Sequence, residues 1–403
     1  LEDFWKHYYG PVEDYKTYKD RYYGVAAQLP TTFIEHLCGF ELSYQQIYLL
    51  RHVYTFLVFF AACICFWFIC RRLTKSPWMA LLGCVMLVGS PRILADSFYN
   101  IKDLIFLSFW VLATWCGICF IRKPGAKTML ALSILGGICT NVRIVGAILF
   151  VVCLPVAFLK GVGDKKGRKT LLWCLLTAVL SVLVYIGVSP VTWSDTVGEI
   201  INTLKVFSSY TTHTTPVYYM GEWINLTELP WHYLFVWVGI TTPVLYLVLF
   251  ALGTLQWGGR GVGMIKNKRL PDEREWDVLF IGLTVLIPVL YVLLARPVLY
   301  NGWRHFYFIY PAMILFAVFG FMAVTDLIQR TGKSGKNILT KIWFALFGVY
   351  LLSIAGWIVK NHPFEYVYFN LPSRSHIEGN FEKDYWSMSK LDAFQYICEN
   401  DSS

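Results

Sequence analysis

Charged residues are scarce in this chain: Asp, Glu, Lys and Arg make up 15% of its 403 residues, whereas apolar residues make up 56%. A soluble globular domain carries roughly 25% charged residues, because it needs polar surface to stay dissolved. The composition therefore excludes a soluble enzyme, a disordered chain and a nucleic-acid-binding module. A chain of this kind belongs in a membrane.

Charge is absent above all from the interiors of ten apolar runs. A helix crosses the hydrocarbon with about 20 apolar residues, or with fewer where the bilayer is thinned. We predict an all-α polytopic membrane protein, and the ten visible transmembrane helices lie at about 53–70, 78–91, 104–121, 128–142, 144–159, 170–188, 233–252, 277–295, 306–324 and 340–358. Polar residues 140–143 interrupt one long run, which favours two short helices; one long tilted helix is the alternative.

Other expected signatures are missing as well. The cysteines show no zinc spacing, and the chain shows no internal repeat. No run carries an ionisable group at mid-membrane, as a secondary transporter often does. A transporter or lipid flippase is therefore kept only as the alternative function, behind which come a membrane O-acyltransferase and a scaffold.

The charges that are present lie unevenly between alternate loops. Five loops hold 20 of the 35 Lys and Arg residues, and they are 71–77, 122–127, 160–169, 253–276 and 326–341. An excess of Lys and Arg marks the cytoplasmic side. The net charge of +9 is thus an orientation signal, and we expect no nucleic-acid partner.

This orientation divides the chain into three parts. We predict a first external loop at 1–52, a transmembrane core at 53–358 and a short external C-terminal segment at 359–403. Because a chain usually starts in the cytoplasm, we expect one further helix upstream of Leu1, eleven in all. The aromatic residues Phe364, Phe369, Phe381 and Trp386 predict that the C-terminal segment folds back over the outer mouth rather than trailing in solvent.

Two short outer loops concentrate polar residues. The first, 92–103, carries Arg92, Asp96, Asn100, Lys102 and Asp103, and the second ends at Arg304 and His305. Together with Arg143 these loops could converge on one outward-facing pocket, where Arg and Lys would suit a phosphate. Snorkelling of each Arg toward lipid headgroups is the plainer alternative.

The first external segment is acidic and aromatic. It carries Glu2, Asp3, His7 and, further on, Asp20. Carboxylates there could act as a general base or hold a divalent cation, and the tyrosine rings offer flat faces for sugars. An ordinary solvated loop is the alternative.

In the order of these elements the chain resembles the GT-C superfamily of integral-membrane glycosyltransferases, which includes protein O-mannosyltransferases and bacterial aminoarabinose transferases. The residues that carry the resemblance are Glu2-Asp3, Arg92-x(7)-Asn100-x-Lys102-Asp103, Asn141-x-Arg143, Arg304-His305 and the tail from His362 to Asn370 with Asp384 to Ser389. The visible sequence departs from the family's pattern in two ways: it does not include the first helix, which we expect upstream, and it shows no long soluble C-terminal domain such as oligosaccharyltransferases carry.

The resemblance implies transfer of a sugar from a polyprenyl-phosphate donor to a glycan, lipid or protein acceptor. The reaction would occur at the external face of a bacterial plasma membrane, with inversion. Asp3 is expected to be the catalytic base, with Asp103 second. The donor would be bound by Arg92, Asn100, Lys102, Arg143, Arg304 and His305, with Glu2, His7, Asp20 and Asp96 serving the acceptor or a supporting role. A divalent cation at Asp3 or Asp103 stays open.

Overall fold

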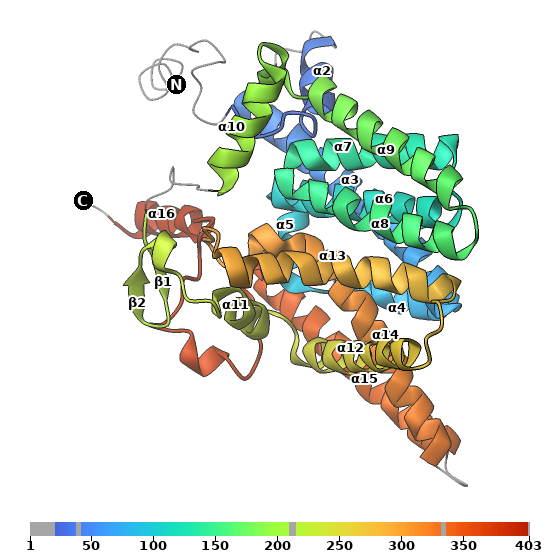
Figure 1. The fold of residues 1–403 in the computed structure, drawn as a ribbon. Coiled ribbons are helices and arrows are strands. Elements are labelled where there is room, and N and C mark those ends of the chain that lie inside the picture. The colour runs from blue at the N-terminus through green and yellow to red at the C-terminus, as the bar shows by residue number, and fades with distance from the viewer. Residues whose placement is uncertain (1–20, 38–41, 209–214, 332–335, 402–403) are drawn as a thin grey trace. The chain divides into compact units, whose positions relative to one another are not determined.

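The computed structural model describes residues 21–37, 42–208, 215–331 and 336–401, which are mostly helical (Figure 1). Glu2, Asp3, His7 and Asp20 lie outside these residues. The chain divides into two compact units. Unit 1 comprises Leu1–Arg51 and Leu112–Thr212, and unit 2 comprises His52–Val111 and His213–Ser403.

The predicted all-α polytopic character is confirmed. Among the described residues, seven helical segments are long and apolar enough to cross a membrane, and they are Tyr44–Thr74, Asp103–Arg122, Ile144–Gly163, Gly167–Gly187, Glu273–Ala295, Arg304–Arg330 and Ile338–Asn361. A pair of helices bent by 70° would make an eighth span. The number of ten therefore stays a prediction.

Unit 1 is built around α7 and α9, which lie side by side in Figure 1 and run parallel, since Ser133 contacts Thr177 and Asn141 contacts Val188. Its elements are α2 (Leu29–Leu37), α7 (Ala126–Val142), η1 (Ile144–Ala147), α8 (Ile148–Gly163), α9 (Gly167–Gly187), η2 (Pro190–Trp193) and α10 (Thr196–Ser208). Arg143 has an extended backbone (φ −147°, ψ 130°) and ends α7. The prediction of two short helices over 128–159 is confirmed, and the single long helix is wrong.

Helices α3 (Tyr44–Thr74) and α6 (Asp103–Arg122) each contribute residues to both units. Unit 2 further contains α4 (Pro77–Val88), α5 (Pro91–Tyr99), α11 (Tyr233–Thr241), α12 (Val244–Lys266), α13 (Glu273–Ala295), η4 (Arg304–Ile309), α14 (Tyr310–Thr331) and α15 (Lys336–Asn361). Glycines let α12 and α14 approach closely, since a Cβ on Gly253 would lie 1.8 Å from the Phe316 carbonyl oxygen. Such close contacts through small residues are typical of membrane helices.

Two predicted boundaries in unit 2 are wrong. Residues 92–103 were expected to form a loop, but most of them belong to α5, which Pro91 begins because proline suits the first helical turn. The expected span 233–252 is broken between α11 and α12, since Pro243 disfavours a helical Thr242. Helix α12 then continues through the predicted loop from 253, where Trp257 packs against Phe319 with ring centroids 5.1 Å apart.

The C-terminal segment folds back onto unit 2, as predicted, over residues 364–386. Its short elements are η5 (Glu365–Val367), η6 (Arg374–His376) and α16 (Ser389–Asn400), and they lie near a hairpin of β1 (Val217–Tyr219) and β2 (Glu222–Ile224), which η3 (Leu226–Glu228) follows (Figure 1). Tyr366 and Phe369 are buried, and Phe381 pairs with Tyr219 of β1. The side chains of α16 are exposed.

Candidate functional site

Two carboxylates meet at the junction of α5 and α6, where one amide holds them. The Asn100 Nδ2 donates to Asp96 Oδ1 and to Asp103 Oδ2, both at 3.2 Å, and Asn100 Oδ1 accepts from the Asp103 backbone N–H at 2.8 Å. All three side chains are almost fully buried, with at most 1% exposed. Asn100, expected to bind the donor, thus orients the two carboxylates and caps the first turn of α6.

Asp103 also forms a buried ion pair. The Arg304 Nη1 lies 2.6 Å from Asp103 Oδ2, so that the pair links the start of η4 to the start of α6. The Arg304 guanidinium lies over the ring of Tyr300 with its Cζ 5.0 Å from the centroid. Its Nε is buried and has no hydrogen-bond partner among the described residues. One N–H of this cation therefore remains available for an anionic ligand.

Arg92 has a comparable environment. Its Nε donates to the Tyr368 carbonyl oxygen at 3.0 Å, and its Cζ lies 4.9 Å from the Phe369 ring centroid. The side chain is buried, and its Nη2 has no hydrogen-bond partner within the described part of the chain. Gly302, with φ +75°, lies beside it, since a Cβ there would be 3.9 Å from Arg92 Nη1. Arg92 and the segment leading to Arg304 are thus neighbours.

The C-terminal segment completes this cluster, which we call the arginine–aspartate cluster: Arg92, Asp96, Asn100, Asp103 and Arg304. The Trp386 Nε1 donates to Asp96 Oδ1 at 3.1 Å, and the Trp386 ring meets Tyr99 edge-on at 5.6 Å. Tyr385 directs its hydroxyl toward Asp96 Oδ2 at 3.5 Å. The sequence placed both residues in the tail pattern from Asp384 to Ser389, but neither was expected to belong to the site.

Asp384 shapes the turn that presents Tyr385 and Trp386. Its carboxylate accepts hydrogen bonds from the backbone N–H groups of Met388 and Ser389 at 3.1 and 3.2 Å, and from the hydroxyls of Tyr366 and Ser389. Partial burial acts to raise the pKa of Asp384, but these hydrogen bonds outweigh it and lower that pKa. The ionised carboxylate therefore fixes the turn at neutral pH.

Lys102 and His305 adjoin the cluster. The Lys102 backbone N–H donates to Asn100 Oδ1 at 3.2 Å, and the His305 ring meets Tyr300 edge-on at 4.6 Å. Their role in donor binding stays a prediction. Within the described residues no group of three His, Cys, Asp or Glu side chains could hold a metal ion. The suggested divalent cation at Asp103 therefore has no such set of ligands among the described residues. Asp3, the other suggested ligand, is not one of the described residues.

In unit 1, Asn141 joins three segments. Its Oδ1 accepts from the Ala26 N–H at 2.9 Å, and its Nδ2 donates to the Ser189 hydroxyl at 2.5 Å and the Val188 carbonyl at 3.2 Å. A Cβ on Gly24 would lie 1.7 Å from the Asn141 carbonyl oxygen. Asn141 of the Asn141-x-Arg143 motif therefore holds the segment around Gly24 and Ala26 against the end of α7. Arg143 belongs to this unit, and its donor contact stays a prediction.

The Gly24→Ala variant is expected to weaken this joint by about 1–3 kcal/mol, because the new methyl group overlaps a backbone oxygen that cannot rotate away. The measurement is the unfolding temperature of the purified protein together with the rate of proteolysis near residue 24. Gly187→Ala is the matched control in the same unit, since nothing lies within 4 Å of its Cβ position. Equal behaviour of the two variants would contradict the joint.

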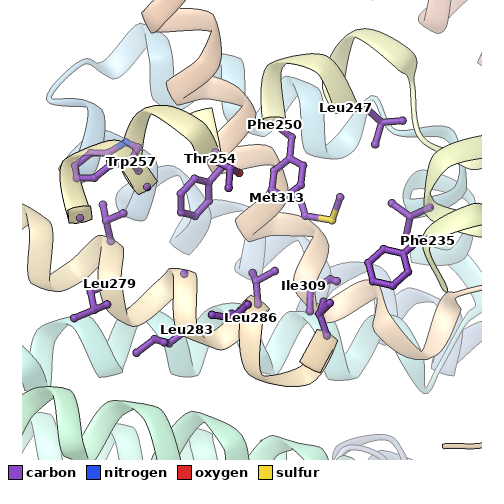
Figure 2. A pocket seen from close by; sticks show the side chains of 18 of the residues that line it. Phe235, Leu247, Phe250, Thr254, Trp257, Leu279, Leu283, Leu286, Ile309 and Met313 are labelled. Atoms are coloured by element: carbon purple, nitrogen blue, oxygen red, sulfur yellow. The ribbon is translucent and has the colours of Figure 1, made fainter. Parts of the chain in front are cut away.

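An apolar groove of about 650 Å³ lies in unit 2 among α11, α12, α13 and α14. Figure 2 shows Leu279, Leu283 and Leu286 of α13 on one side and Phe250 of α12 on the other. At one end lie Phe235 of α11 and Ile309 of η4.

These two elements also carry residues of the cluster's surroundings. Helix α11 carries Trp237, whose ring centroid is 5.6 Å from Arg92 Cζ, and η4 begins with Arg304. The groove thus leads toward the arginine–aspartate cluster at this end, and its far end lies at Trp257 and Glu275.

Comparison with known families supports the class that the sequence resembles. Residues 39–192 match the family model of dolichyl-phosphate-mannose-protein mannosyltransferases. The match supports a membrane glycosyltransferase of the GT-C superfamily. The matched segment of the glycosyltransferase includes Arg92, Asn100, Lys102, Asp103 and Arg143, whereas Arg304 and the C-terminal segment lie beyond it. No curated protein matches the chain.

Proposed function

We propose that this glycosyltransferase moves a sugar from a polyprenyl-phosphate donor to a glycan, lipid or protein acceptor at the external face of a bacterial plasma membrane, with inversion. One observation carries the proposal: Arg92 and Arg304 each keep a buried guanidinium nitrogen without a partner among the described residues, and they adjoin α11 and η4, two elements that line the apolar groove. A ligand with a phosphate head and a hydrocarbon tail matches both features.

The charges suit a phosphate. Arginine binds phosphate through directional, charge-assisted hydrogen bonds, which are strong where water is largely excluded. Asp103 neutralises part of the Arg304 charge. The buried Arg92 has no ion pair among the described residues, so its positive charge can attract the phosphate. The donor phosphate would therefore lie between the free N–H groups of the two arginines. The tail would follow the groove past Ile309 and Met313.

The same charges favour departure of the sugar. When the bond between the anomeric carbon and the phosphate oxygen breaks, negative charge grows on the phosphate, and fixed arginines stabilise that charge. The leaving group needs no added proton, but the acceptor hydroxyl must lose one. A carboxylate on the opposite face of the sugar can take it, which gives a single displacement with inversion.

We assign the base to Asp3, with Glu2, His7 and Asp20 near the acceptor. Asp103 is engaged by Arg304 and Asn100, and Asp96 by Asn100 and Trp386, so these two carboxylates serve to position the cluster. Lys102, Arg143 and His305 complete the proposed donor-binding set.

The test is transfer of labelled sugar from a polyprenyl-phosphate donor by the purified protein in detergent. Arg92→Gln should weaken transition-state and donor binding by about 2–4 kcal/mol, because it removes a charged partner from a dry site. Arg296→Gln is the control, since Arg296 is an exposed arginine of the second outer loop. Donor affinity and turnover unchanged within about twofold in Arg92→Gln would show that Arg92 does not bind the phosphate. Movement of the intact donor across liposomes without transfer would favour a flippase.

Orientation is tested by labelling single cysteines placed in intact cells. Lys165→Cys, in the turn after α8, should be protected from an impermeant thiol reagent, whereas Lys390→Cys, on exposed α16, should react. The reason is the excess of Lys and Arg in the five loops that we assign to the cytoplasm. Native Cys398 is exposed and must be replaced in the background. Labelling of both positions from the same side would overturn the orientation and the external active site.

A further inference from the structure

The far end of the groove, away from Arg92 and Arg304, carries a second pair of arginines. The Arg260 Cζ lies 4.8 Å and the Arg274 Cζ 5.0 Å from the ring centroid of Trp257, which lines the groove. Arg274 also lies 5.6 Å from the Phe319 ring. Arg260 belongs to α12 and Arg274 to α13, so the pair joins the two helices that form the sides of the groove.

Two nearby carboxylates act on this pair electrostatically but form no ion pair with it within the described part of the chain. The carboxylate of Glu275, which lines the same end of the groove, is bound by Arg269 through contacts of 2.5 and 2.7 Å. Asp272 caps α13 by accepting from the backbone N–H groups of Arg274 and Glu275 at 2.8 Å. Neither carboxylate forms an ion pair with Arg260 or Arg274 among the described residues.

One donor of the pair is buried without a partner. The Nε of Arg274 has no hydrogen-bond partner among the residues that the structure describes. Two like charges against one ring, with a buried N–H unpaired, lower the stability of the fold unless an anion joins them. Cation–π contact with Trp257 orients both guanidiniums, because the ring face attracts them, but it supplies no countercharge.

We propose that Arg260 and Arg274 bind the phosphate of an acidic phospholipid, and that one acyl chain of this lipid enters the groove beside Trp257. The apolar lining favours a lipid over free phosphate: Val278, Leu279 and Met264 continue the groove from Trp257. The expected orientation places this end at the cytoplasmic leaflet, whose anionic lipids attract basic residues. The proposal does not depend on the sugar-transfer reaction.

The experiment measures quenching of tryptophan fluorescence by lipids with brominated acyl chains. The full chain is placed in nanodiscs that contain either brominated phosphatidylglycerol or brominated phosphatidylcholine. The difference between the unchanged protein and Trp257→Phe isolates the signal of Trp257. We expect half-maximal quenching of Trp257 at about a tenfold lower fraction of phosphatidylglycerol than of phosphatidylcholine.

The preference for phosphatidylglycerol should vanish in Arg260→Gln/Arg274→Gln. Lys266→Gln/Lys268→Gln removes the same charge from the same α12–α13 region, where both lysines are exposed, and should keep it. Equal quenching by the two lipids, or an equal loss in the lysine variant, would overturn the proposal in favour of general attraction at the surface. Loss of the preference on adding inorganic phosphate, with the ionic strength held constant, would show a free-phosphate site and reject the lipid.

A further measurement avoids the arginine variants in case they fold poorly. In the unchanged protein, high salt should weaken quenching by phosphatidylglycerol and leave quenching by phosphatidylcholine unaltered, since only the first depends on net headgroup charge. An equal response of both lipids to salt would contradict the assignment.

Discussion

Sugar transfer by the Asp3→Asn variant is expected to be about 10²–10⁴ times slower than by the unchanged protein, with donor affinity retained. Asparagine keeps the size and hydrogen bonding of aspartate but cannot accept the proton of the acceptor hydroxyl. Asp3 is the proposed base, and it belongs to the acidic segment at the start of the chain. The measurement is the transfer rate at saturating donor together with donor binding.

The neighbouring carboxylates make this experiment selective. Glu2→Gln is the adjacent control and should change the rate far less. Asp103→Asn should act mainly on stability, because the Asp103 carboxylate already accepts from Arg304 and Asn100. A nearly unchanged rate in Asp3→Asn would remove Asp3 from the mechanism, and a collapse only in Asp103→Asn would move the role of base there.

The contact of Asn141 with Gly24 and Ala26 provides a second test of the role of Asp3. It fixes Ala26, at the described end of the segment that carries Asp3, through a hydrogen bond from the Ala26 N–H. If Asp3 acts as the base, Gly24→Ala should lower the transfer rate as well as stability, because it displaces the anchor of that segment.

Local features of the chain could be predicted from the sequence. Long apolar runs require helices in a membrane, whatever the packing, because each backbone N–H and C=O must be paired inside the segment. Polar residues 140–143 marked the end of α7, since Asn141 and Arg143 are costly within hydrocarbon. The helical start at Arg304 was likewise foreseen, although the structure places a 3-10 turn before α14.

The contacts within the site could not be predicted in this way. The ion pair of Asp103 with Arg304 joins residues 201 positions apart, and the hydrogen bond from Trp386 to Asp96 joins residues 290 apart. Residue types indicated which loops carry charge but not which atoms pair. The groove arises from the arrangement of α11 to α14, for which a linear pattern carries no signal.

A missed local signal explains the error at α5. Ser90 followed by Pro91 is typical of a helix start, and Asn100 followed by Asp103 is typical of a helix boundary. The density of charge in this segment was interpreted as a loop at the membrane surface. In the structure, an ion pair and hydrogen bonds within unit 2 offset the cost of removing Arg92, Asp96 and Asp103 from water.

The Arg304→Gln variant should lose about 3–5 kcal/mol of stability, because it leaves the carboxylate of Asp103 buried without its cation. Asp103 is 1% exposed, so water cannot replace the lost partner. The measurement is thermal unfolding in detergent. Lys383→Gln is the control: it breaks a lysine–carboxylate pair with Glu378 whose two side chains are 40% and 86% exposed, and should lose about 1 kcal/mol or less.

A double variant separates the two roles of Arg304. In Asp103→Asn/Arg304→Gln no uncompensated charge is buried, so most of the lost stability should return, as is common when a buried ion pair is replaced as a whole. Donor affinity should nevertheless remain weak, because the cation that meets the phosphate is still missing. A double variant that is stable and transfers sugar at the normal rate would show that Arg304 serves only the fold. A single variant as stable as the unchanged protein would show that the pair contributes little to it.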